Sequence, residues 1–174
     1  MASAHDLKNS APFVLTLEMD GESFAALDAL RRRYYAPERN LVPAHVTLFY
    51  RLPAERSREI KALLNKLAAS QRPLDIAAGE PKLLERGVGI FLSSPQLNAL
   101  RDELAREWWP WLDEQDRAGI RPHVTIQTTD SEVEARKTLQ AMRATRLPRI
   151  RGVGLHLWRY RDGPWEHEQL FRFR

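Results

Sequence analysis

Two kinds of apolar spacing alternate along the chain and predict an α+β fold. Apolar residues run together or alternate with polar ones in six stretches that are typical of strands: 13–19, 45–51, 88–93, 123–128, 150–160 and 165–173. Apolar residues recur every three or four positions in four stretches that are typical of amphipathic helices: 22–35, 54–70, 95–111 and 131–145. In the first helix these residues are Phe24, Leu27, Leu30 and Tyr34, beside a run of three arginines. Residues 73–85 are predicted to be extended with breaks near Gly79 and Pro81, and 113–122 to form a polar loop.

The predicted elements occur twice in the same order. Strand, helix, proline-containing loop, strand, helix and strand follow one another in each half, and the first strands begin 75 residues apart (88 minus 13). Self-similarity of this kind indicates a duplicated unit. We therefore expect a bilobal, duplicated fold with a pseudo-two-fold axis. It would consist of two antiparallel sheets with outer helices around a central cleft.

A short motif lies at the start of one strand in each half. His45-Val46-Thr47-Leu48 and His123-Val124-Thr125-Ile126 both read His-Val-Thr-apolar, and their histidines are 78 residues apart (123 minus 45). In an extended strand, alternate side chains point to opposite faces, so histidine and threonine share one face and the apolar pair shares the other. Taken alone, each motif also fits an ordinary half-exposed strand. Repetition in a duplicated frame favours a functional site in which both His-Thr faces line one cleft.

Composition limits the chemistry that such a site can use. The chain has 174 residues, 43% of them hydrophobic, which suits one domain over 12–174 after a flexible N-terminus at 1–11. It contains no cysteine, so a disulfide framework, a thiolate zinc site and a cysteine nucleophile are excluded. The N-terminus lacks the apolar core of a signal peptide, and no apolar run approaches the length of a membrane span, so we expect a cytoplasmic protein. The net charge of +4 gives modest support for a phosphate-bearing partner.

The paired motifs and the order of elements resemble the 2H phosphoesterase superfamily, whose hallmark is two His-x-Thr/Ser-apolar motifs. The resemblance covers nearly the whole chain and implies catalytic roles for His45, Thr47, His123 and Thr125. It also implies that no metal or other cofactor is needed. One imidazole would act as base and the other as acid, while both hydroxyls would donate to phosphate oxygens as charge develops. The symmetry of the motifs leaves open which histidine is the base.

Other residues are predicted to contact the substrate with weaker support. Arg51 lies six positions after His45 and could reach phosphate, or could be a solvated arginine at the strand end. Gln127 continues the second motif. Tyr35, Arg39 and Arg159 could contact a base or ribose, or could anchor their loops and hairpin. His156 is predicted to be a packed or edge histidine, and His167 to be exposed.

The sequence thus predicts a phosphoric diester hydrolase that acts on a 2′,3′-cyclic phosphate or a 2′-5′ phosphodiester. The substrate would be an RNA end or a small nucleotide, and the reverse reaction would be 2′-5′ RNA ligation. A non-catalytic RNA- or nucleotide-binding module and a phosphodiesterase of a small cyclic-phosphate metabolite are the alternatives. We infer neither a membrane partner nor an obligate protein partner.

Overall fold

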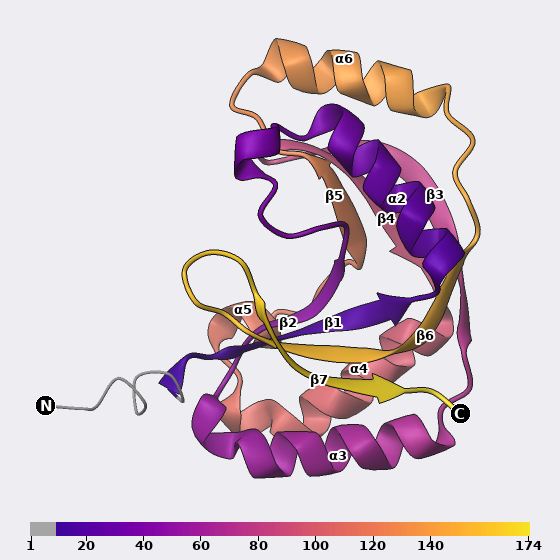
Figure 1. Ribbon diagram of the computed structural model, residues 1–174. Coiled ribbons are helices and arrows are strands. Elements are labelled where there is room, and N and C mark those ends of the chain that lie inside the picture. Colours follow the sequence, from indigo (N-terminus) through magenta and orange to yellow (C-terminus); the bar gives the residue numbers. More distant parts are fainter. Residues whose placement is uncertain (1–9) are drawn as a thin grey trace, which may run out of the picture.

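A computed structural model describes residues 10–174 and shows the predicted α+β fold (Figure 1). The expected flexible segment, 1–11, lies almost entirely outside the described residues. The strands are β1 (Phe13–Met19), β2 (Val46–Leu52), β3 (Leu74–Leu84), β4 (Gly87–Ser93), β5 (His123–Gln127), β6 (Ile150–Arg159) and β7 (Glu166–Arg172). The helices are α2 (Gly21–Tyr34), α3 (Ser57–Ser70), α4 (Pro95–Trp108), α5 (Glu114–Arg117) and α6 (Glu132–Arg143). Single 3-10 turns lie at Pro37–Arg39, Ala54–Arg56 and Trp109–Trp111.

All strand pairs are antiparallel, and β3 connects two groups of strands. The order is β2-β1-β6-β3-β4-β5. Strand β3 pairs with the first residues of β6, and β7 pairs with its later residues, from Gly154 to Arg159. The first residues of β3 pair with β6, and its later residues pair with β4. A register shift between Ala78 and Pro81 lets one strand run through the breaks that the sequence predicted there. Such a bulge bends a strand. Pro81, which has no N–H to donate, pairs with Ile90 on β4 directly after the shift.

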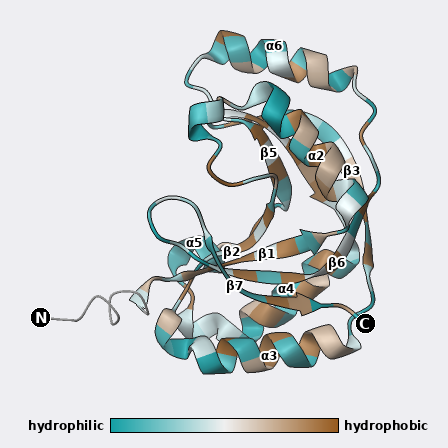
Figure 2. Cartoon of the chain, in the orientation of Figure 1, coloured by the Kyte–Doolittle hydropathy of each residue, from teal (hydrophilic) through white to brown (hydrophobic). Residues whose placement is uncertain are grey.

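The helices cover the two groups of strands on their outer sides. In Figure 1, α3 and α4 lie beside β1, β2 and β6, whereas α2 and α6 lie beside β3, β4 and β5. The large core joins residues from both groups, including Phe13 and Phe49 from β1 and β2 and Ile90 and Val124 from β4 and β5. Figure 2 shows apolar colours along β1 and β5 and banded colours along the helices, as expected when one helix face contacts solvent. Within residues 10–174, no helix combines the length and the apolar character that crossing a bilayer requires.

Two local predictions need correction. The expected polar loop 113–122 contains the short helix α5, whose Asp116 is completely buried. In α2 the buried residues are Ser23, Leu27, Asp28 and Arg31, whereas Phe24 is 37% exposed. The buried face of this helix is therefore largely polar. Two of its side chains, Asp28 and Arg31, form hydrogen bonds with backbone groups at the two motifs.

Candidate active site

The two motif histidines lie at the starts of two strands, one in each group of strands. His45 directly precedes β2, and His123 is the first residue of β5. Each ring is held by the carbonyl two residues earlier: His45 Nδ1 lies 2.8 Å from the oxygen of Pro43, and His123 Nδ1 lies 2.9 Å from that of Arg121. A carbonyl can only accept, so Nδ1 must carry a proton in both rings. Nε2 is therefore the nitrogen that can gain or lose a proton in chemistry.

The motif threonines lie on well-defined strands beside the histidines. Thr47 is paired with Thr16 on β1, and Thr16 is in turn paired with His156 on β6. These three side chains form a row across one face of the sheet, because directly paired residues project to the same side. Thr47 is buried, and Thr125, paired with Gly89 on β4, is partly exposed.

Helix α2 contacts the backbone at both motifs. Asp28 accepts a hydrogen bond of 2.9 Å from the N–H of Ala44, the residue before His45. Arg31, one helical turn later, donates from Nη1 to the carbonyl of Thr125 at 2.6 Å and from Nε to Asn40. One buried face of one helix thus holds the two motif segments relative to each other.

The environment of His45 favours the neutral imidazole. Burial lowers the pKa of His45 to about 4, against an opposing effect of the bond to Pro43 O, and the positive charges of Arg31 and His123 lower it further. The Trp165 ring contacts the imidazole, with ring centroids 4.7 Å apart. His123 has a different neighbour, the Phe91 ring at 5.4 Å. The strands that carry the two motifs, β2 and β5, contact each other directly.

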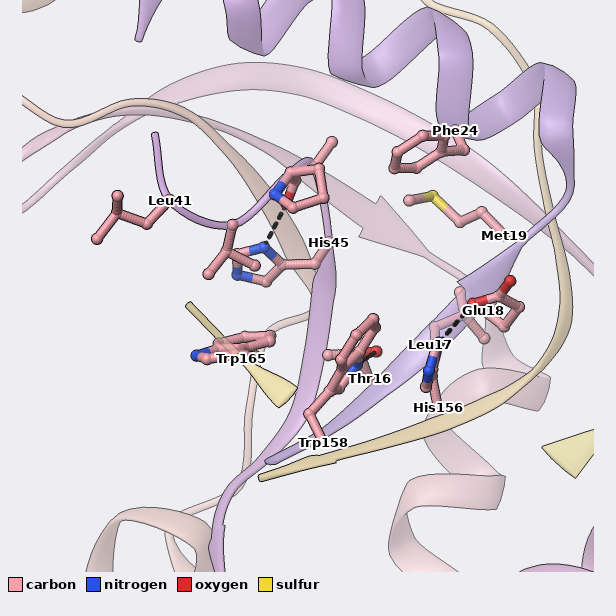
Figure 3. Close-up of a pocket in the computed structure, with 13 residues that line it drawn as sticks. Thr16, Leu17, Glu18, Met19, Phe24, Leu41, His45, His156, Trp158 and Trp165 are labelled. Atoms are coloured by element: carbon pink, nitrogen blue, oxygen red, sulfur yellow. Dashed lines mark hydrogen bonds and ion pairs between the residues drawn. The ribbon is translucent and has the colours of Figure 1, made fainter. Parts of the chain in front are cut away.

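A cavity of about 270 Å³ opens beside His45 (Figure 3). Residues from β1, α2, the loop before β2, β6 and the β6–β7 connection line it. In Figure 3, His45 and Trp165 lie on one side, Trp158 lies in the middle, and His156 and Glu18 lie on the other side. Its lining combines aromatic rings with a few polar groups, as is typical of a small-molecule site.

Three of the residues that the sequence predicts to contact the substrate lie close to one another, but away from this cavity. Tyr35, Arg39 and Gln127 line a shallow pocket beside the first turn of α6. The guanidinium of Arg31 lies 4.0 Å from the centre of the Tyr35 ring. These residues are near the second motif, but the structure does not bring them to the cavity beside His45.

The two other predicted arginines also lie outside the cavity. Arg51 is exposed and lines a neighbouring cavity with Tyr160 and Arg161, which shares only Trp165 with the first. Arg159 lies on the face of β6 opposite Trp158, where its Nε is 2.6 Å from a Glu168 carboxylate that also binds Lys61. The structure therefore places Arg159 in a buried ion-pair network outside the cavity, and its contact with a substrate stays a prediction.

Sequence reasoning overlooked two residues that shape the site. Arg31 occupies a buried helix position. Its spacing from Leu27 and Tyr34 places it on the apolar face of the predicted helix, and this could have marked it in the sequence. Trp165 precedes β7 and reaches His45 only because the last hairpin folds over the site, so no local pattern marks it. Across residues 10–174, no group of three or more His, Cys, Asp or Glu side chains is arranged to hold a metal ion.

Comparison with known proteins agrees with the fold. The profile of the 2′-5′ RNA ligase superfamily matches residues 19–164. The structure is similar to TT0787 of Thermus thermophilus, with 18% identity, a TM-score of 0.59, and coverage of 94% of this chain and 98% of that one. It is also similar to E. coli LigT in its apo form, with 16% identity, a TM-score of 0.59, and coverage of 94% and 97%. No curated protein sequence matches significantly. Because the family profile spans most of its length, this chain belongs to the 2′-5′ RNA ligase superfamily of 2H phosphoesterases.

Proposed function

We propose that this protein is a metal-independent phosphodiesterase that opens 2′,3′-cyclic phosphates, or cleaves 2′-5′ phosphodiesters, at RNA ends or in small nucleotides. The observation that carries the proposal is the pair of motif imidazoles, each held at Nδ1 by the carbonyl two residues earlier. Superfamily membership supports phosphoesterase activity on RNA or nucleotides. Structures of E. coli LigT with 3′-AMP, ATP and NADP⁺ support a nucleotide as the substrate class.

The low pKa of His45 favours this residue as the general base. At pH 7 its Nε2 holds a free lone pair and can accept the proton of an attacking water molecule. The water oxygen then bonds to phosphorus as the bond between phosphorus and O3′ breaks. His123 donates its Nε2 proton to the leaving O3′, and the product keeps a single 2′-phosphate. In the ligation direction, a 5′-OH would attack the phosphorus of a 2′,3′-cyclic phosphate, the bond between phosphorus and O3′ would break with protonation of O3′, and a 2′-5′ linkage would form.

Hydroxyl groups and one fixed positive charge would stabilise the transition state. Thr47 and Thr125 lie two residues after the histidines on their strands and can donate to non-bridging oxygens, as oxyanion-hole donors do. Arg31 lies close enough to His45 to affect its titration, and its charge favours an anionic phosphate between the motifs. Since Arg31 already binds the Thr125 carbonyl, it contributes through position and field.

The test is incubation of the purified protein with the four nucleoside 2′,3′-cyclic monophosphates and with a 2′-5′-linked dinucleotide, in the presence of EDTA. The blank is the His45→Ala/His123→Ala double variant. We expect turnover to a 2′-phosphate from the cyclic compounds, and no turnover by the blank. Substantial activity in either single variant would refute the acid–base pair, and a requirement for a divalent metal would refute the mechanism. Binding of RNA without turnover of any substrate would instead support a non-catalytic module.

A further inference from the structure

The cavity beside His45 has an aromatic floor. Trp165 lies next to His45, the Trp158 ring centre is 6.2 Å from that of Trp165, and His156 stacks on Trp158 at 3.6 Å. Two exposed apolar side chains, Phe24 and Leu41, lie at its rim. A row of rings facing apolar side chains suits a flat aromatic ligand, as in the single-strand recognition of nucleobases. Its volume of about 270 Å³ is near the lower end for small-molecule sites, which suits one base.

One carboxylate lies at the end of the cavity away from His45. Among the residues that line the cavity, Glu18 is the only acidic one, and none is lysine or arginine. Glu18 Oε2 is 3.1 Å from His156 Nδ1, and His156 Nε2 is 2.7 Å from His167 Nδ1. Because an ionised carboxylate only accepts, His156 donates from Nδ1, and a neutral His156 then accepts at Nε2 from His167 Nδ1. The expected packed or edge histidine thus connects exposed His167 to Glu18 and holds the carboxylate in position.

A fixed carboxylate discriminates between bases by their donors. It offers about four acceptor positions, of which His156 uses one. Guanine presents two adjacent donors, N1–H and the N2 amino group, on its Watson–Crick edge. Adenine and cytosine present an amino donor beside a ring-nitrogen acceptor, and uracil presents one N–H between two carbonyls. Guanine is therefore the only one of the four bases whose Watson–Crick edge offers two adjacent donors to a carboxylate.

We propose that this cavity is a guanine-binding subsite in which Glu18 accepts hydrogen bonds from N1–H and the N2 amino group of the base. Trp158 and Trp165 contact the faces and edges of the ring system. His156 and His167 are positioning residues for the carboxylate. The subsite rests on the proposed phosphodiesterase function, because it holds the nucleoside of a substrate whose phosphate lies at His45.

The size of the preference follows from the loss of charge-assisted hydrogen bonds. A site built around such bonds rejects a substrate that cannot form them, and we expect guanosine to be preferred over adenosine by about 10- to 100-fold in kcat/KM. Glu18→Gln replaces an acceptor with an amide whose NH₂ group opposes the guanine donors. It should reduce the ratio to about 1 to 3, mainly by lowering kcat/KM for guanosine 2′,3′-cyclic monophosphate.

The experiment measures kcat/KM for the guanosine, adenosine, cytidine and uridine 2′,3′-cyclic monophosphates. Glu103→Gln, which changes an exposed carboxylate on α4, is the matched control and should keep the wild-type ratio. His156→Phe keeps a ring on Trp158 and removes the bond to Glu18, so it should lower the guanosine-to-adenosine ratio severalfold. A merely structural role of His156 would instead lower both rates equally.

The outcomes separate this subsite from the proposed function. Similar kcat/KM values for all four substrates would leave the phosphodiesterase function standing and would overturn the guanine subsite. A guanosine preference that survives Glu18→Gln would overturn the role of Glu18. If no cyclic nucleotide is hydrolysed, calorimetric binding of guanosine and adenosine 3′-monophosphates decides. Tighter guanosine binding that Glu18→Gln abolishes supports the subsite without the activity, and equal binding overturns it.

Discussion

Replacing Trp165 with alanine should shift the acid limb of the pH–rate profile. Burial is the main reason that the pKa of His45 is about 4, and the Trp165 ring, 4.7 Å away, is the aromatic group in contact with it. If the replacement exposes the imidazole fully, the pKa returns toward the ordinary value of about 6.5. At pH 5 the neutral fraction of His45 would then fall from about 0.9 to about 0.03, a loss of at most about 30-fold in kcat/KM. At pH 8 His45 is neutral in both proteins. The ratio of their kcat/KM values should then reflect only the effect of the substitution on substrate binding.

The assay is kcat/KM from pH 4 to 9 for the wild type and for Trp165→Ala. The ratio between the two cancels the titration of groups that the substitution leaves alone. The His45 pKa is read independently by NMR titration of the imidazole, assigned with His45→Asn. Trp109→Ala is the control, because Trp109 is 52% exposed and lies in the 3-10 turn after α4. A uniform loss of rate at every pH, with no movement of the acid limb, would refute the role of Trp165 in the protonation of His45.

The same shift makes stability depend on pH with a defined sign. The pKa of His45 is lower in the folded state than in the unfolded state, so the folded state binds fewer protons between about pH 6.5 and pH 4. His45 therefore makes its full contribution to the free energy of unfolding above about pH 6.5. This contribution decreases as the pH drops toward 4, by at most about 3 kcal/mol. Urea unfolding of His45→Asn should show a smaller acid-induced decrease than that of the wild type. An identical decrease in both would show that other groups cause it.

Four further substitutions test the site and the contacts that support it. Thr47→Val and Thr125→Val should each lower kcat by about 10- to 1,000-fold, by loss of one donor to the phosphate; unchanged kcat would exclude that role. Arg31→Met should cost about 2–4 kcal/mol in urea unfolding and also lower kcat, because it unties the Thr125 carbonyl from α2; loss of stability without loss of kcat would separate the two. Arg159→Leu should cost about 2–4 kcal/mol by leaving the Glu168 carboxylate without its main partner, and we expect KM to be nearly unchanged. A large rise in KM would instead support Arg159 as a substrate contact.

Periodic apolar patterns predicted the elements of this fold well, because each of these elements buries one face. The strand at Phe13–Met19 was located to the residue, and the other strands and long helices to within a few residues. Helix α5 was missed because its four residues carry no apolar stripe. What stabilises it is non-local: Asp116 accepts backbone hydrogen bonds from Tyr50 and Arg51 on β2, which no local pattern reveals. The pseudo-two-fold relation between the halves stays a prediction, although the element order does repeat.

The candidate site divides in the same way between local and long-range information. The strand periodicity placed His45 with Thr47, and His123 with Thr125, because alternation is a property of a single strand. Arg51 was expected beside His45 by the same rule, but β2 is irregular. The pairings Leu15 with Phe49 and Thr16 with Thr47 require a bulge there, and strict alternation fails beyond it. Glu18 was not noted, because its proposed role depends on a cavity lined by segments that are distant in sequence.

The structure also gives a physical reason why two nearly identical motifs would take different roles in the proposed mechanism. Both histidines make the same Nδ1 bond to a carbonyl, so the motif itself does not decide which one is the base. The difference comes from the last hairpin: β7 has no counterpart after β3 in the first half, and the segment that leads into β7 brings Trp165 against His45. The same hairpin supplies Trp158, His156 and His167, which line the cavity or hold Glu18. If the proposals hold, this one addition to a repeated element order both selects the general base and creates the base-binding subsite. The pH profile of Trp165→Ala and the nucleotide preference of Glu18→Gln would then change independently.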